Sequence, residues 1–100
     1  MIVLVCYDIA DDRKRDKLAK YLERAGLVRI QLSVFLGPAK LLNRAEFTQS
    51  LDGFVEAGAF PRDRIVLFEL PMRSVEESWS KGLDKAELEY IAGTLTTFFF

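Results

Sequence analysis

The stretch IVLVCYDI, residues 2–9, decides the fold because it is an apolar run that closes on a carboxylate. The run Ile2–Tyr7 predicts a buried β-strand. Asp8 ends this strand, and a charged segment with helical spacing follows it. A carboxylate at the end of a strand, beside the start of a helix, is a common place for chemistry, so Asp8 is the first candidate functional residue.

A second stretch, RIQLSVF at residues 29–35, is also apolar but carries polar side chains at alternate positions. It lies in a predicted strand, Val28–Phe35, which is either one strand or two short strands of a hairpin. Alternate residues of a strand point to one face. We therefore expect Arg29, Gln31 and Ser33 to share a polar face near Asp8, although a strand that simply faces solvent is the plainer interpretation.

The segment after Asp8 predicts a helix from about Arg13 to Ala25. Asp11 or Asp12 can cap its start, because an Asp side chain accepts from the free N–H groups of a first turn. Gly26 is a plausible end. The apolar stripe of this helix, at helical spacing, is Leu18, Tyr21, Leu22 and Ala25.

The middle of the chain predicts a break, a second helix and a further strand. Gly37-Pro38 is expected to end the second strand segment. Asn43 and Glu46 form a capping-box pattern, and we expect their helix to run to Gly58. Arg64–Leu70 then predicts a strand. The core face of the second helix is expected to be Phe47, Leu51, Phe54 and Val55.

This order predicts an α+β fold, a ferredoxin-like β-α-β-β-α-β sandwich over residues 1–72. A doubly wound sheet is the competitor if Val28–Phe35 does not split. Residues 73–100 form an extension, with capping-box patterns at Ser74–Glu77 and Asp84–Glu87 and helix ends expected at Gly82 and Gly93. Thr94–Phe100 predicts a terminal strand, whose phenylalanines need an apolar surface to cover them.

Composition excludes several classes of protein. With 100 residues, half of them hydrophobic, the chain is expected to be one globular domain. It has no apolar run near the roughly 18 residues of a membrane span, and we expect no signal peptide and a cytoplasmic location. Cys6 is the only cysteine and is expected to be a small buried side chain. Because the chain has no histidine, zinc sites of the His/Cys kind and Ser-His or Cys-His pairs are excluded.

Asp8 admits two interpretations. In the first, it makes an Asx turn or supports the helix cap, as Asp commonly does between strand and helix. In the second, it binds Mg²⁺, a hard cation that prefers oxygen ligands and keeps several waters, so that one or two carboxylates suffice. A two-fold homodimer would present Asp8 twice about one axis, and two carboxylates would then share one ion.

The first helix carries four cations on one face. Arg13, Lys17, Lys20 and Arg24 fall within a sector of about 60°, away from the apolar stripe. A solvated outer face is the usual meaning of such a stripe. The alternative is a sequence-independent contact with the phosphates of a nucleic acid. The net charge of −1 means that any such contact depends on a local patch.

The two stretches together resemble the CRISPR-associated protein 2 family. Its pattern is an apolar strand ending in Tyr-Asp-Ile, a charged helix, and Arg-x-Gln-x-Ser-Val-Phe, and the resemblance covers residues 1–70. It implies that Asp8 binds metal and takes part in phosphodiester cleavage, and that Lys14 and Arg15 join the basic stripe in nucleic-acid binding. It also places supporting residues near the site: Tyr7, Arg29 to neutralise a phosphate, Ser33 to orient a water, and Phe35 in the core or dimer interface.

The resemblance leaves two functions open. One is a homodimeric, Mg²⁺-dependent endonuclease acting on RNA or double-stranded DNA. The other is a non-catalytic dimeric scaffold that holds DNA and bridges subunits of the CRISPR integrase during spacer acquisition. The family also implies that the extension, residues 73–100, packs on the dimer partner. A small metabolite-binding regulatory domain is a third class, but no Gly-rich phosphate loop supports it.

Overall fold

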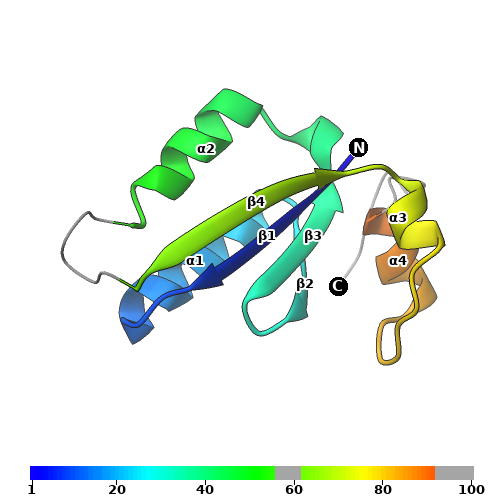
Figure 1. Cartoon of the computed structure of the whole chain (residues 1–100), viewed down its shortest axis with the longest axis horizontal. Coiled ribbons are helices and arrows are strands. Elements are labelled where there is room, and N and C mark those ends of the chain that lie inside the picture. The colour runs from blue at the N-terminus through cyan, green and yellow to red at the C-terminus, as the bar shows by residue number, and fades with distance from the viewer. Residues whose placement is uncertain (56–61, 92–100) are drawn as a thin grey trace.

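The computed structural model describes residues 1–55 and 62–91. Along the chain, a strand, a helix, two strands, a helix and a strand precede a helical extension (Figure 1). This order confirms the predicted β-α-β-β-α-β plan. The elements are β1 Ile2–Asp8, α1 Asp12–Arg24, β2 Val28–Gln31, β3 Val34–Pro38, the 3₁₀ turn η1 Ala39–Leu41, α2 Arg44–Asp52, β4 Arg64–Leu70, α3 Arg73–Glu76 and α4 Lys85–Ile91.

The four strands form one antiparallel sheet in the order β2-β3-β1-β4, so β1 is a central strand with partners on both sides. The segment Val28–Phe35 does split into two strands, which confirms the ferredoxin-like alternative and rules out the doubly wound one. A doubly wound sheet needs parallel strands, and every pair here is antiparallel.

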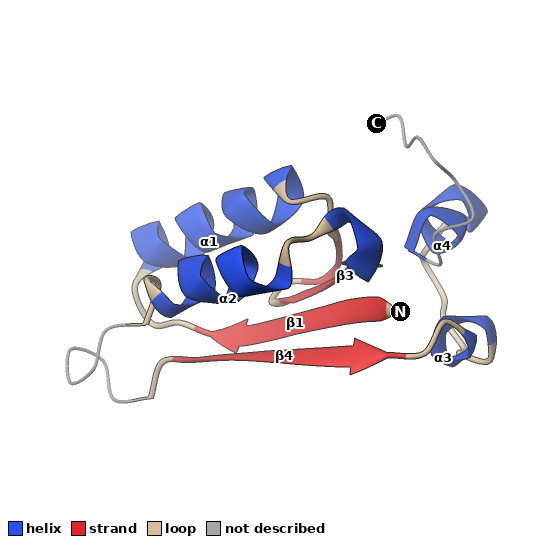
Figure 2. Ribbon diagram, turned by 90° about the horizontal axis from the view of Figure 1, so that it is seen from above, coloured by secondary structure: helices blue, strands red, loops and turns tan. Residues whose placement is uncertain are grey.

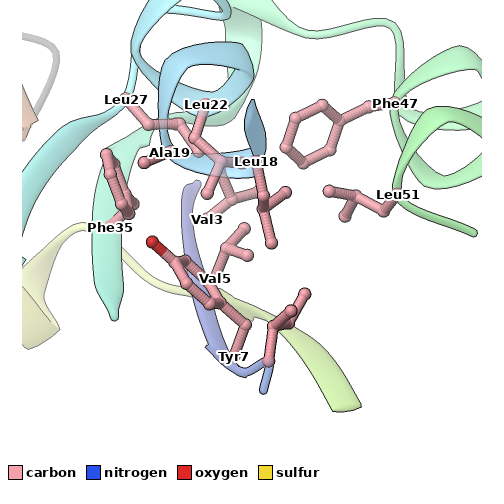
Figure 3. Close-up of a cluster of buried hydrophobic side chains, with 11 residues drawn as sticks. Val3, Val5, Tyr7, Leu18, Ala19, Leu22, Leu27, Phe35, Phe47 and Leu51 are labelled. Carbon is pink, nitrogen blue, oxygen red and sulfur yellow. The ribbon is translucent and has the colours of Figure 1, made fainter. Parts of the chain in front are cut away.

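The helices α1 and α2 cover one face of the sheet (Figure 2). Because side chains alternate along a strand, β1 sends Val3, Val5 and Tyr7 into this helix-side core (Figure 3), and all three are buried. Phe35 enters the same core from β3 and is fully buried. The helices contribute five further buried members of this layer, and the loops at either end of α1 contribute Ile9 and Leu27. The helical members are Leu18, Ala19, Leu22, Phe47 and Leu51.

The described residues cover the other face of the sheet only in part. The extension covers one end of it, where Ile91 of α4 packs with Ile2 and Val28. The uncovered part, which we name the open face, consists of Leu4, Cys6, Val34, Val66 and Phe68. Cys6 is therefore only half-buried, contrary to expectation, because it lies on this second face.

The ends of α1 match the sequence prediction. The Asp11 side chain accepts from the Lys14 N–H at 2.8 Å, which satisfies one of the free donors of the first turn. Gly26 follows the C-cap with a φ of +96°, a conformation that costs glycine little and other residues more. Tyr21 on this helix stacks on Phe47 of α2, and their ring centroids are 5.8 Å apart.

Two predicted ends in the middle of the chain were wrong. Gly37-Pro38 does not break the strand but belongs to β3, because both residues pair with the start of β1. A Cβ atom at Gly37 would lie 2.5 Å from a Leu27 methyl carbon, so glycine allows this close approach. The helix α2 begins after Asn43 as expected but ends at Asp52 rather than Gly58, because Gly53 closes it with a tightened last turn.

The extension is only partly as predicted. Asp84 and Glu87 form the expected capping box, since each side chain accepts from the backbone N–H of the other. The box at Ser74 was wrong, because α3 begins at Arg73 without a side-chain cap. Gly82 lies in the loop after α3 and does not end it. The expected helix end at Gly93 falls outside the described residues.

The described part of the extension packs on its own chain. Ile91 is fully buried, and the Tyr90 hydroxyl donates to the Gly26 carbonyl at 2.6 Å. The terminal strand expected at Thr94–Phe100 lies outside the described residues, and packing of the extension on a dimer partner stays a prediction. Within residues 1–55 and 62–91, no helix is long and apolar enough to cross a membrane.

Candidate functional site

Asp8 is the last residue of β1 and is exposed. The alternation of β1 places its side chain on the same side of the sheet as Leu4 and Cys6, opposite the helices. Figure 2 shows that this end of β1 lies beside the start of β4 and near the start of α1. Asp8 therefore stands at the rim of the open face, where a ligand can reach it.

The loop that follows Asp8 is held from two directions. The Ala10 N–H donates to Asp63 Oδ1 at 2.9 Å, which ties the loop to the chain just before β4. The Arg15 guanidinium donates to the Ile9 carbonyl at 3.0 Å, which ties the loop to α1. These contacts fix the backbone on both sides of the strand end, so Asp8 projects from a rigid support.

The other acidic residues near Asp8 are already engaged. Asp11 caps α1, and Asp12 forms an ion pair with Arg15. In the described part of the chain, no group of three or more Asp, Glu, His or Cys side chains is placed to hold a metal ion. The side chain of Asp8, unlike those of Asp11 and Asp12, has no hydrogen bond or ion pair within the described residues. It is a donor that fits Mg²⁺ bound largely by water and by one or two carboxylates.

Tyr7 and Phe35 lie behind Asp8 in the helix-side core. Both are buried, and their rings stack with centroids 6.2 Å apart. The Tyr7 hydroxyl donates to the Leu32 carbonyl at 3.4 Å, which links β1 to the turn between β2 and β3. Phe35 packs in the core, one of the two places expected for it. These two residues support the strand that carries Asp8.

The expected polar face of Arg29, Gln31 and Ser33 was wrong. A register shift between Arg29 and Gln31 interrupts the β2–β3 ladder, and such a bulge reverses the alternation of side chains. Arg29 pairs with Phe35 on the helix side, where its guanidinium carbon lies 5.1 Å from the Phe35 ring centroid. Gln31 instead pairs with Val34 of the open face, and Ser33 lies in the turn.

Asp8 and Arg29 are consequently on opposite faces of the sheet. Ser33 comes nearer, because its carbonyl accepts from the Tyr7 N–H at 3.1 Å, next to Asp8 in the chain. The structure thus brings the Ser33 backbone to the end of β1 but keeps Arg29 away from Asp8 within one chain. The roles expected for Arg29 and Ser33 stay predictions.

The basic stripe of α1, Arg13, Lys17, Lys20 and Arg24, is exposed along its whole length. In the described part of the chain, none of the four forms an ion pair with a carboxylate. Lys14 and Arg15 are half-buried, and Arg15 is occupied by its contacts with Ile9 and Asp12. The four stripe residues are therefore freer than Arg15 to meet a phosphate.

Sequence reasoning missed Asp63 and Arg64, to which it assigned no function. The strand register places Arg64 directly opposite Asp8. Asp63 holds Ala10, and its second oxygen, Oδ2, is buried without a hydrogen-bond partner in the described structure. A charged cluster immediately before a predicted strand was the available signal, but its meaning depends on which strand it pairs with.

Comparison with known proteins identifies related chains. A family model described as CRISPR associated protein Cas2 matches residues 1–78. A CRISPR-associated endoribonuclease Cas2 of Thermofilum pendens is 40% identical over 58 residues, which span 58% of this chain and 62% of that protein. The Cas2 endoribonuclease of Archaeoglobus fulgidus is 39% identical over 72% of this chain and 71% of its own length. That of Aeropyrum pernix is 31% identical over 80% of this chain and 84% of its own length.

We expect Asp63→Ala to loosen the loop that follows Asp8. The variant removes the acceptor of the Ala10 N–H, so hydrogen exchange at Ala10 should accelerate and the free energy of unfolding should fall by about 1 kcal/mol. Asp63→Asn keeps an acceptor oxygen and should retain most of the protection. Amide exchange by NMR checks both variants, and unchanged exchange at Ala10 in Asp63→Ala would contradict the tether.

Proposed function

The chain belongs to the CRISPR-associated Cas2 family, and from that premise we propose that it is a metal-dependent endonuclease of CRISPR adaptation, with RNA as its substrate. The observation that carries the proposal is Asp8, an exposed carboxylate at the end of a central strand whose following loop is held on two sides. The names of the three relatives, all endoribonucleases, support RNA as the substrate class.

Asp8 is the residue that holds the metal in this proposal. Bound Mg²⁺ would supply a Lewis acid for the phosphoryl oxygens and a water of lowered pKa. The chain itself contributes the rigid placement of Asp8, through Tyr7 in the core behind it and the tethers of Ala10 and Ile9 in front. With a single carboxylate from each chain, two copies are needed to give an ion two protein ligands.

A second copy of the chain is the proposed occupant of the open face. Phe68 is 52% exposed and Val66 38% exposed, on a sheet surface that continues through Leu4, Cys6 and Val34. A two-fold dimer through this face would cover these apolar side chains. Because Asp8 stands at the rim of the same face, such a dimer carries both Asp8 residues at its interface.

A second candidate function is a dimeric scaffold that holds DNA and bridges integrase subunits in the cytoplasm. The exposed basic stripe of α1 favours it, because cations on one helix face contact phosphates without regard to sequence. The two functions use different surfaces, Asp8 at the end of β1 for cleavage and the α1 stripe for duplex binding. One protein can therefore perform both.

Asp8→Asn should abolish cleavage without unfolding the protein. The change removes the charge that holds the metal, so the rate of Mg²⁺-dependent RNA cleavage should fall at least about 100-fold. Stability should change by about 1 kcal/mol or less, because Asn also serves at turns and caps. Cleavage assays and thermal unfolding of the purified variant measure both quantities. Full cleavage by Asp8→Asn would mean that another site or a contaminant is responsible.

Replacing Lys17 and Lys20 by Gln should weaken duplex DNA binding in a salt-dependent way. Each phosphate that a cation neutralises contributes about −0.9 to the slope of log affinity against log salt, so removing four cations from a dimer should flatten the slope by up to about 3–4 units. Binding titrations over a range of salt measure the slope. Lys81→Gln with Lys85→Gln is the matched control on the extension, and equal slopes in the two double variants would argue against the stripe.

Phe68→Glu should convert the dimer to a monomer. The new carboxylate would be buried without a partner between the two open faces, which disfavours association. Leu32→Glu is the matched control, because Leu32 is 84% exposed on the β2–β3 turn and is not one of the open-face residues. Light scattering gives the mass of each variant, and a Phe68→Glu variant that stays dimeric would place the interface elsewhere.

A further inference from the structure

The antiparallel pairing of β1 with β4 brings Arg64 beside Asp8. The two residues are direct partners at one end of the ladder, the last residue of β1 and the first of β4. Partners in an antiparallel ladder have their side chains on the same face, with Cβ atoms about 4.5–5.5 Å apart. Both residues are exposed, so they form an adjacent anion and cation that solvent can reach.

The guanidinium of Arg64 retains donors for a ligand. Its Nε donates to the Arg62 carbonyl at 3.4 Å. In the part of the chain that the structure describes, neither Arg64 nor Asp8 forms an ion pair. An arginine has five N–H donors in a planar fork, and the terminal ones match two oxygens of a phosphate.

The backbone under this pair is fixed on both strands. The hydrogen bond from Ala10 to Asp63 joins the residue next to Arg64 to the loop that follows Asp8. The ladder continues with Tyr7 opposite Ile65, and Tyr7 is buried in the core. The spacing of Asp8 and Arg64 is therefore set by sheet geometry, as it should be for residues that act on one group.

We propose that Arg64 binds the scissile phosphate of the nucleic acid held at Asp8. This inference rests on the proposed nuclease function and names the cation that the site needs. In hydrolysis, a water oxygen bonds to phosphorus as the ester P–O bond breaks; the water releases its proton and the departing oxygen takes one up. Negative charge builds on the phosphoryl oxygens, and a guanidinium beside them stabilises it.

Arg64 fills the role that the sequence suggested for Arg29. Arg29 lies on the helix side of the sheet over Phe35, whereas Arg64 and Asp8 share a face. A competing role for Arg64 is structural, because it also borders the hollow between α2 and β4, where Asp52 lies. If Arg64 acted through Asp52, then Asp52→Asn should reproduce the effect of removing Arg64.

The test compares Arg64→Gln, Arg64→Lys and Asp52→Asn with Arg73→Gln, a matched control at the start of α3, beyond the far end of β4. RNA cleavage by Arg64→Gln should fall about 100-fold in kcat with a smaller change in KM, as expected when a transition-state donor is removed. Arg64→Lys should recover part of the rate. Asp52→Asn and Arg73→Gln should cleave RNA at the wild-type rate. All four variants should have the same thermal unfolding midpoint as the wild type.

A binding measurement separates this inference from the proposed function. The salt slope of single-stranded RNA affinity should flatten by about 0.7 for each Arg64 side chain replaced by Gln, and Arg73→Gln should leave it unchanged. If the wild type does not cleave RNA, the nuclease proposal fails and this slope alone judges Arg64. In that case, equal slopes for Arg64→Gln and Arg73→Gln would overturn the role of Arg64. If the wild type does cleave RNA, equal cleavage by Arg64→Gln and Arg73→Gln would overturn it. Loss of cleavage in Asp52→Asn would also overturn it.

Discussion

The structure depends on the position of β1, which pairs with β3 on one side and β4 on the other. A central strand has both backbone edges satisfied, so its alternation of side chains cannot slip without exposing the core. Val3, Val5 and Tyr7 are held in the helix-side layer, and the next residue, Asp8, must face the other way. Burial of one set of residues thus fixes the exposure of the functional carboxylate.

The edge strand β2 shows what happens where this constraint relaxes. A bulge shifts its register, so Arg29 covers Phe35 on the helix side while Gln31 lies with Val34 on the other. The cation that the motif predicted beside Asp8 instead covers the core. The site instead meets a different cation, Arg64, because β4 pairs with β1 without any such shift.

Overall charge is a poor guide to this protein because its charges are sorted by surface. The net charge is only −1, yet the exposed stripe of α1 is basic along its length. The acidic residues of the same helix either pair with a neighbour, as Asp12 does with Arg15, or lie roughly 70–90° from the centre of the stripe, as Asp16 and Glu23 do. A nucleic-acid backbone responds to the charges of the local surface, because salt largely screens charges that lie more than about 10 Å away.

The sequence by itself determined the elements that depend on neighbours in the chain. Local patterns of residues a few positions apart predict four of these elements: the strand Arg64–Leu70, a cap at Asp11 or Asp12, the capping box of Asp84 with Glu87 and the turn at Gly26. Only the tertiary structure decided what meets Asp8. Arg64 reaches it through strand pairing across more than half of the chain, and Asp63 holds Ala10 in the loop that follows it. No local pattern records that register.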